Sequence, residues 1–323
     1  MNKTAVVISI LALACSFAAQ AQKPTGLPGN YPNKLIRVVV SSAPGGAIDI
    51  AGRAFATKLN ERWTNVIMEN RPGIGVAYEM VMKSPPDGYT LLVTSISAYS
   101  SAELVQKVPY NIRTKFPPII QLTGSPYIVT VSTNLPVKNI RELIDYARTN
   151  PNKINFGYTN VGSASQLFGE LLMHEFKLDM QGIPFKGTGP AYIDQMAGRI
   201  HLLLGSSSSA GPLVKTGKIR GIATTGITRS KDQPDLPTVR ETYPNFDTFS
   251  GWVGVFGVEG MNPALINALN KEGNIILAQP DVEKLLSADG EIVGGTPEQF
   301  RKVIADSLDS TARIIREANI KME

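Results

Sequence analysis

The stretch IRVVVSSAPGGAIDIAGR, residues 36–53, decides how this chain folds. A run of β-branched residues stops at two serines, the turn Pro44-Gly45-Gly46 follows, and a helical pattern begins directly after the turn. A strand, a glycine turn and a helix in this order place backbone N–H groups around an anion in α/β proteins. The stretch therefore predicts an α/β fold whose first turn holds a nucleotide, a reaction intermediate or a carboxylate.

The same alternation of apolar runs and helical periodicity continues along the chain, which predicts parallel sheets flanked by helices. About 300 residues follow the N-terminal leader, more than one core usually serves, so we expect two domains. The expected strands are Leu35–Ser41, Val66–Glu69, Thr90–Thr94, Ile128–Ser132, Ile154–Tyr158, Gln181–Pro184, Ile200–Leu204, Ile219–Thr224 and Trp252–Val258. The expected helices include Ile48–Arg62, Asn139–Thr149, Ser163–Phe176, Ala191–Ala197, Pro263–Ala278 and Pro297–Ala318.

Residues 1–21 have the pattern of a secretory signal peptide. Lys3 precedes an apolar stretch too short to span a membrane, and Ala19-Gln20-Ala21 is an A-x-A cleavage site. We therefore expect an exported protein, cleaved near Ala21. A lipoprotein acylated at Cys15 is the alternative, although Ala12-Leu13-Ala14 is a poor lipobox. Cys15 is the only cysteine, so the mature chain is expected to have no disulfide.

Composition and motifs give little support to nucleic-acid binding or catalysis. The net charge is +5, and no run of basic residues exceeds two. His174 and His201 have no second ligand at metal-binding spacing, and no nucleophile–base motif is visible. The segment GPLVKTGKI, residues 211–219, departs from a phosphate-binding loop because Ile219 stands where magnesium needs a hydroxyl. We expect no catalytic residue, no metal and no cofactor.

Small hydroxyl residues and glycines gather where the expected strands end. Four clusters show this pattern, at residues 41–42, 94–97, 162–165 and 205–209. Hydroxyls and exposed N–H groups are neutral, orientation-specific partners for a carboxylate. In open α/β sheets ligands bind at the carboxyl ends of strands, so the clusters favour a ligand cleft there, although serine is common in turns generally.

An internal similarity supports the same interpretation. When the opening stretch is shifted by 116 residues, Gly46 falls on Gly162 and Asp49 falls on Ser165. Each copy is then a strand, a glycine turn and a helix start, and two such turns facing one cleft would hold an anion from both sides. The alternative, that any two strand–helix units look alike, stays open.

The order and spacing of several short motifs resemble the Bug family, the periplasmic solute-binding proteins of tripartite tricarboxylate transporters. The resemblance runs from Tyr31-Pro32 to the last expected helix, and each motif is weak alone. The motifs are PGGAIDI (44–50), ENRPGIG (69–75), PPDGYTLLV (85–93), PFKGTGPA (184–191), KTGKIRGIATTG (215–226) and DLPTVRE (235–241).

The resemblance implies a two-lobed periplasmic binding protein fold of type II, in which each lobe is a mostly parallel sheet flanked by helices. Two crossing strands would join the lobes, with residues 27–126 plus 250–323 in the first and 127–249 in the second. A monomer of this kind captures a small carboxylate and delivers it to a membrane permease. The alternative partner is a sensor kinase, and the least favoured alternative is a periplasmic enzyme on the same scaffold.

The resemblance also implies which residues contact the ligand, by position in the matching motifs. In the first lobe these are Ser42, Gly45, Gly46, Ala47, Asp49, Ser95 and Ser97. In the second lobe they are Gly162, Ser163, Ser165, Gly205 and Ser206. The sequence leaves open whether Asp49 contacts the ligand or only caps its helix.

Three positions depart from the family pattern. The family often has an aromatic residue at Ser42, and Gly-Asn usually follows Arg-Pro-Gly where this chain has Ile74-Gly75-Val76. Family members often carry Asp where Gly205 stands, and in those that bind amino acids that Asp is suited to pair with the ligand ammonium. We therefore expect a di- or tricarboxylate, or an aromatic carboxylate, in preference to an amino acid, unless other side chains fill the gap.

Overall fold

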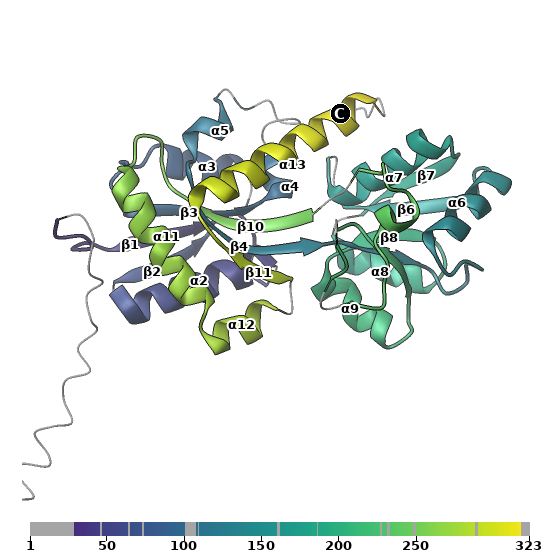
Figure 1. Ribbon diagram of the computed structural model, residues 1–323, viewed down its shortest axis with the longest axis horizontal. Coiled ribbons are helices and arrows are strands. Elements are labelled where there is room, and N and C mark those ends of the chain that lie inside the picture. Colours follow the sequence, from purple (N-terminus) through teal and green to yellow (C-terminus); the bar gives the residue numbers. More distant parts are fainter. Residues whose placement is uncertain are drawn as a thin grey trace, which may run out of the picture.

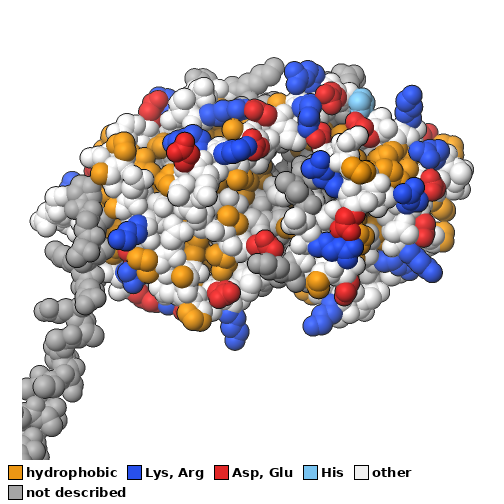
Figure 2. Space-filling view, in the orientation of Figure 1, with side chains coloured by type: hydrophobic (Ala, Val, Ile, Leu, Met, Phe, Trp, Pro, Cys, Tyr) orange, Lys and Arg blue, Asp and Glu red, His pale blue; other side chains and the backbone are white. Residues whose placement is uncertain are grey.

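The computed structural model describes residues 29–317, except 46, 64, 73, 101–107, 109, 160–161, 186, 227, 231–232, 248–249 and 288–289. Two sheets lie in two halves of the molecule, side by side along its long axis (Figure 1). The two-lobed α/β fold predicted from the sequence is thus confirmed. None of the described helices is long and apolar enough to cross a membrane. Basic and acidic side chains are interspersed over the face shown in Figure 2.

The first sheet has six strands in the order β11-β4-β10-β3-β1-β2. Its strands are β1 (Ile36–Val40), β2 (Val66–Asn70), β3 (Thr90–Ser95), β4 (Pro118–Pro126), β10 (Ser250–Phe256) and β11 (Glu291–Gly294). β1 pairs in parallel with β2 and β3, whereas β10 runs antiparallel to β3 and β4. The sheet is therefore mixed, with a parallel half built from the opening stretch.

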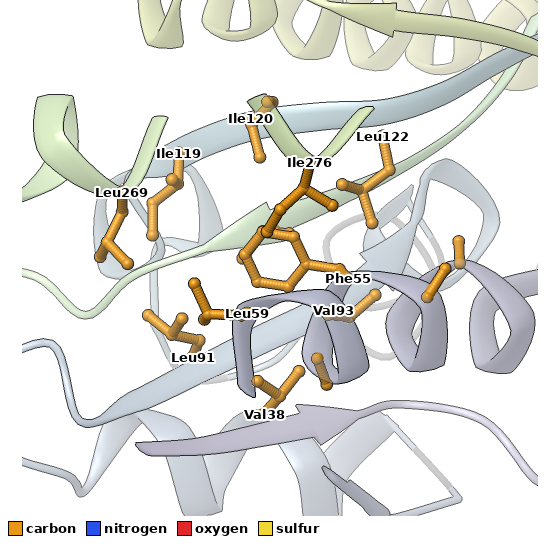
Figure 3. Packing of buried hydrophobic residues seen from close by; sticks show 14 of the residues in the cluster. Val38, Phe55, Leu59, Leu91, Val93, Ile119, Ile120, Leu122, Leu269 and Ile276 are labelled. Atoms are coloured by element: carbon orange, nitrogen blue, oxygen red, sulfur yellow. The ribbon is translucent and has the colours of Figure 1, made fainter. Parts of the chain in front are cut away.

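Helices cover both faces of this sheet. They are α2 (Ala47–Trp63), α3 (Ile74–Met82), α4 (Ile96–Ser100), α5 (Ile112–Lys115), α11 (Pro263–Leu277), α12 (Pro280–Leu286) and α13 (Pro297–Glu317). Figure 3 shows Phe55 and Leu59 of α2 packed against Val38 of β1 and Ile276 of α11. Val39 instead joins the cluster on the opposite face. A strand covered on both faces explains why Val38, Val39 and Val40 are apolar in succession.

The second sheet has five strands in the order β7-β6-β8-β5-β9. Its strands are β5 (Ile128–Val131), β6 (Ile154–Tyr158), β7 (Met180–Pro184), β8 (Leu202–Gly205) and β9 (Arg220–Thr224). Its helices are α6 (Ile140–Thr149), α7 (Ala164–Phe176), α8 (Thr188–Met196), α9 (Ser207–Lys215) and α10 (Val239–Thr242). β6, β7 and β8 are parallel, and β5 lies antiparallel between β8 and β9. Each sheet thus presents strand–turn–helix units along one edge.

The chain crosses between the halves more than once. It passes from β4 to β5 through Tyr127 and returns just before β10. The last helix also reaches across, since Leu308 of α13 lies in the first half's core while Ile314 is buried in the second half's cluster. An ion pair between Arg313 and Asp247 adds to this contact. The two lobe boundaries expected from the sequence stay a prediction.

Several elements were not anticipated. The expected elements contain no counterpart of β4, β11, α3, α4, α5, α9, α10 or α12, and most expected strands differ from the observed ones by one or two residues. β4 begins and ends with proline and contains Gly124, which breaks the sequence pattern of a strand. α9 contains three serines, a glycine and Pro212, all poor helix formers.

Candidate functional site

A cavity of about 460 Å³ opens between the two sheets, and both contribute to its wall. From the first half come residues of the β1–α2 turn and α4, and from the second come the turns that follow β6 and β8. None of its described lining residues is charged. The lining residues are Gly45, Ala47, Ile50, Ser97, Tyr127, Thr159, Ser163, Ala164, Ser165, Thr188, Leu204, Gly205, Ser206 and Ser209. We call this space the cleft cavity.

Four helices begin at the wall of the cleft cavity. α2 starts at Ala47, α7 at Ala164, α8 at Thr188 and α9 directly after Ser206. The first turn of a helix has free N–H groups and carries partial positive charge. α8 in particular begins after Gly187, which supplies no side-chain hydrogen bond to that turn. An uncharged cavity bordered by four such turns is electrostatically suited to an anion.

Asp49 braces the glycine turn that opens the first wall. Its carboxylate accepts hydrogen bonds from the Gly45 amide at 2.9 Å, from Asn70 Nδ2 at 2.8 Å and from Arg53 Nη2 at 2.9 Å. Burial disfavours the charged form, but these three donors outweigh it and lower the pKa of Asp49. The carboxylate is buried behind the turn, and the Gly45 N–H is already engaged with it. Asp49 therefore shapes the turn.

The second half repeats this brace with a neutral side chain. Gln166 Oε1 accepts a hydrogen bond from the Gly162 amide at 2.8 Å, again four residues apart. The matching pairs are Gly45 with Asp49 and Gly162 with Gln166, so the structural repeat has a shift of 117 residues. The alignment that placed Asp49 on Ser165 is off by one residue, because the bracing acceptor and not the serine is the shared feature.

Serine hydroxyls surround the starts of α7 and α9. Ser163 Oγ lies 3.1 Å from Ser165 Oγ. It accepts a hydrogen bond from the backbone N–H of Gln166, which makes Ser163 the N-cap of α7. Ser206 is the N-cap of α9, and its Oγ lies 2.9 Å from Ser209 Oγ. The hydroxyls are ordered by their own helices, so they present donors to the cleft cavity in fixed positions.

A family model described as "Tripartite tricarboxylate transporter family receptor" matches residues 52–320 of the chain. The chain belongs to this family. Protein BugT of Bordetella pertussis is 29% identical over 100% of this chain and 99% of its own length. The resemblance to Bug proteins is confirmed, and with it the class of periplasmic solute-binding receptors.

Solved structures give the same result for this receptor. An R. palustris protein solved with adipate is 28% identical, has a TM-score of 0.78, and covers 90% of this chain and 99% of its own. MatC of Rhodopseudomonas palustris, with bound malate, is 26% identical with a TM-score of 0.73, over 88% of this chain and 100% of its own. Each of these two relatives was thus solved with a dicarboxylate, adipate in one and malate in the other.

The structure brings together seven of the residues predicted to contact ligand. Gly45, Ala47, Ser97, Ser163, Ser165, Gly205 and Ser206 line the cleft cavity. Ser42, Asp49, Ser95 and Gly162 lie outside this lining, and Gly46 lies outside the described residues. Ligand contact by any of the twelve stays a prediction.

Other lining residues were missed by sequence reasoning. Tyr127 lies at the crossing between β4 and β5, a place with no hydroxyl cluster to mark it. Thr159 follows β6 directly, so the strand-end rule could have found it. Thr188 belongs to the quoted motif PFKGTGPA, but the start of α8 was placed at Ala191.

A second cavity of about 450 Å³ adjoins the first and shares Ser97, Tyr127 and Ala164 with it. We call it the α13 cavity, because residues 303–313 of that helix form one wall. Gly162 lines the α13 cavity but not the cleft cavity. Tyr127 and Ser97 line both cavities and thus stand between the two spaces.

Both histidines have structural surroundings. His201 Nδ1 accepts a hydrogen bond from the backbone N–H of Asn155 at 3.0 Å, and burial lowers the pKa of His201. His174 is exposed beside Glu175. Within the described part of the chain, no group of three or more His, Cys, Asp or Glu side chains is placed to hold a metal ion.

Proposed function

We propose that this receptor captures a small di- or tricarboxylate, or an aromatic carboxylate, in the cleft cavity and delivers it to a tripartite tricarboxylate transporter permease. The observation that carries the proposal is the meeting of four helix N-termini at a cavity whose described lining has no charged side chain. Helix N-termini stabilise an anion through N–H groups without a fixed counter-charge. A ligand held in this way can also leave, as transport requires.

The size and lining of the cavity favour such ligands over amino acids. About 460 Å³ is within the usual range for small-molecule sites. An amino acid brings an ammonium group, which needs acceptors, and no Asp or Glu is among the described lining residues. Adipate and malate in the two solved relatives support the choice of a dicarboxylate.

The seven predicted residues that line the cavity are the proposed contacts. Ser163, Ser165 and Ser206 would donate hydroxyl hydrogen bonds, and Gly45, Ala47 and Gly205 would let the ligand approach the backbone closely. Ser42, Asp49, Ser95 and Gly162 would support these turns from outside the lining. Closure of two lobes over the ligand would then present one surface to the partner.

The partner and the compartment follow from the family. A receptor of a tripartite tricarboxylate transporter serves a permease, which supports transport over presentation to a sensor kinase. We propose export through the signal peptide of residues 1–21 and action as a monomer. Residues 1–21 lie outside the described part of the chain.

Isothermal titration of residues 22–323 against a carboxylate panel tests the proposal. The panel contains adipate, succinate, malate, citrate, benzoate, glutamate and aspartate. We expect saturable binding of at least one non-amino-acid carboxylate and weaker binding of both amino acids. Preferred binding of glutamate or aspartate would contradict the proposed class, and turnover of a ligand, seen by mass, would indicate an enzyme instead.

A further inference from the structure

Gly205 ends β8 at the wall of the cleft cavity, and a phenol oxygen stands where its side chain would be. A Cβ built on Gly205 would lie 1.8 Å from Tyr192 Oη, 3.1 Å from Tyr192 Cζ and 3.2 Å from the Cβ of Ala210. Real Cβ atoms do not come so close to an oxygen. With Tyr192 in this position, residue 205 has to be glycine.

Tyr192 belongs to α8 and is buried in the cluster between α8, α9 and the second sheet. Tyr192 Oη lies 3.1 Å from Ser209 Oγ, and Ser209 Oγ lies 2.9 Å from Ser206 Oγ. Ser206 and Ser209 both line the cavity. Three hydroxyls therefore form a chain from the buried cluster to the ligand space.

We propose that Tyr192 is a positioning residue that makes this end of the cleft cavity a neutral donor site for a second carboxylate of the ligand. The inference rests on the proposed function and deepens it, because it says which end of the cavity recognises a dicarboxylate. Tyr192 acts through Ser209. Its hydroxyl can lie beside Ser209 only because residue 205 is a glycine and has no Cβ.

The direction of the hydrogen bonds explains the effect. A phenol is a stronger donor than an alkyl hydroxyl, so Tyr192 donates to Ser209 and leaves the Ser209 proton for another acceptor. In the structure that acceptor is the Ser206 carbonyl at 3.2 Å, which a carboxylate oxygen in the cavity can replace. Burial raises the pKa of Tyr192, so the phenol stays neutral and adds no repulsion.

The same end of the cavity disfavours an ammonium group. An ammonium has only protons to offer and needs acceptors around it. The carboxylate side chains of Asp and Glu supply such acceptors best, but position 205 has no room for an acidic side chain while Tyr192 keeps its place. A ligand with a carboxylate at this end should therefore bind more tightly than the same ligand with an ammonium there.

The geometric premise has its own test, which needs no ligand. G205A alone must displace the Tyr192 hydroxyl, and we expect it to lower Tm by about 4 °C or more. In the Y192F background the colliding oxygen is gone, so the same substitution should lower Tm by less than half as much. Equal losses in both backgrounds would show that Tyr192 does not occupy this position.

The binding test uses matched ligands. Adipate is compared with 6-aminohexanoate and succinate with 4-aminobutanoate, so that one carboxylate is exchanged for an aminomethyl group. For Y192F we expect about tenfold or greater loss of affinity for the better dicarboxylate and less than twofold change for its amine counterpart. The control is Y31F, which removes a phenol oxygen bound to the Gly88 carbonyl, far from the cavity lining, and should leave both affinities unchanged.

Each outcome of the titrations decides between the two proposals. Unchanged dicarboxylate affinity in Y192F, or equal losses for both members of a pair, overturns the positioning role. A wild-type protein that binds only monocarboxylates also overturns it and leaves carboxylate capture standing. A wild-type protein that binds no carboxylate contradicts the proposed function itself.

Discussion

Replacing Asp49 by Asn tests whether a buried charge holds the first glycine turn. The Asp49 carboxylate accepts hydrogen bonds from Gly45, Asn70 and Arg53, whereas an amide offers one oxygen and turns two N–H groups toward donors. Each hydrogen bond to a charged group contributes roughly 1.5–3 kcal/mol, and the share of Arg53 is small because that side chain is 56% exposed. We expect D49N to lower the free energy of unfolding by about 2–4 kcal/mol at pH 7.

The stability lost in D49N should depend on pH. The folded state lowers the pKa of Asp49 below 3.8, so its stabilising contribution is complete above that value and disappears as pH falls through the lower, folded-state pKa. The difference in the free energy of unfolding between wild type and D49N should therefore become smaller in acid. Urea denaturation at pH 7 and at successive steps below pH 4 measures both effects.

The matched control is D306N. Asp306 also pairs with a basic side chain four residues away on its helix, Lys302, but both side chains are largely exposed. We expect D306N to change the free energy of unfolding by less than about 0.5 kcal/mol. The reasoning is refuted if D49N costs no more than D306N at pH 7, or if its cost is the same at every pH.

Three further substitutions test other parts of the account. Q166A leaves the buried Gly162 amide without its acceptor, so urea denaturation should show a loss of about 1–3 kcal/mol in the free energy of unfolding. Unlike the loss in D49N, this loss should be the same in acid, and a smaller loss in acid would contradict the reasoning. I314A removes a fully buried side chain where α13 meets the second half, and a loss of about 2–5 kcal/mol is expected by the same assay, whereas less than about 1 kcal/mol would show that this contact is loose. A47E places a carboxylate at the start of α2, where a negative charge suits the helix, so Tm should be unchanged. The same charge lies at the cavity wall and repels an anion, so titration should show at least about tenfold weaker carboxylate binding. Unaltered binding would place the ligand elsewhere.

Much of the fold was predictable because local patterns and tertiary packing agree. β1 and α2 were placed within one residue of their observed bounds, since a β-branched run is followed by a clear helical period. β4 was missed because its prolines and Gly124 resemble a loop, and it is ordered by pairing with both β10 and β11. α9 was missed because a cap at Ser206 and burial of Ala210, not propensity, hold it in place.

The candidate site was predictable where it follows the ends of parallel strands. Gly45, Ser163 and Gly205 line the cleft cavity as that rule and the family resemblance implied. Tyr127 could not be found in this way, because it reaches the cavity from the crossing between sheets. Nor does the sequence show that Tyr192, thirteen residues before Gly205, fills the space beside that glycine.

The central claim is that helix N-termini from both halves hold a carboxylate in the cleft cavity. A crystal structure of residues 22–323 with the tightest-binding carboxylate tests it most directly. The account predicts carboxylate oxygens within hydrogen-bond distance of the turns at Ser163–Ser165 and Ser206, with α2 on the opposite wall. A ligand bound in the α13 cavity, or held by charged side chains outside the lining of the cleft cavity, would contradict it.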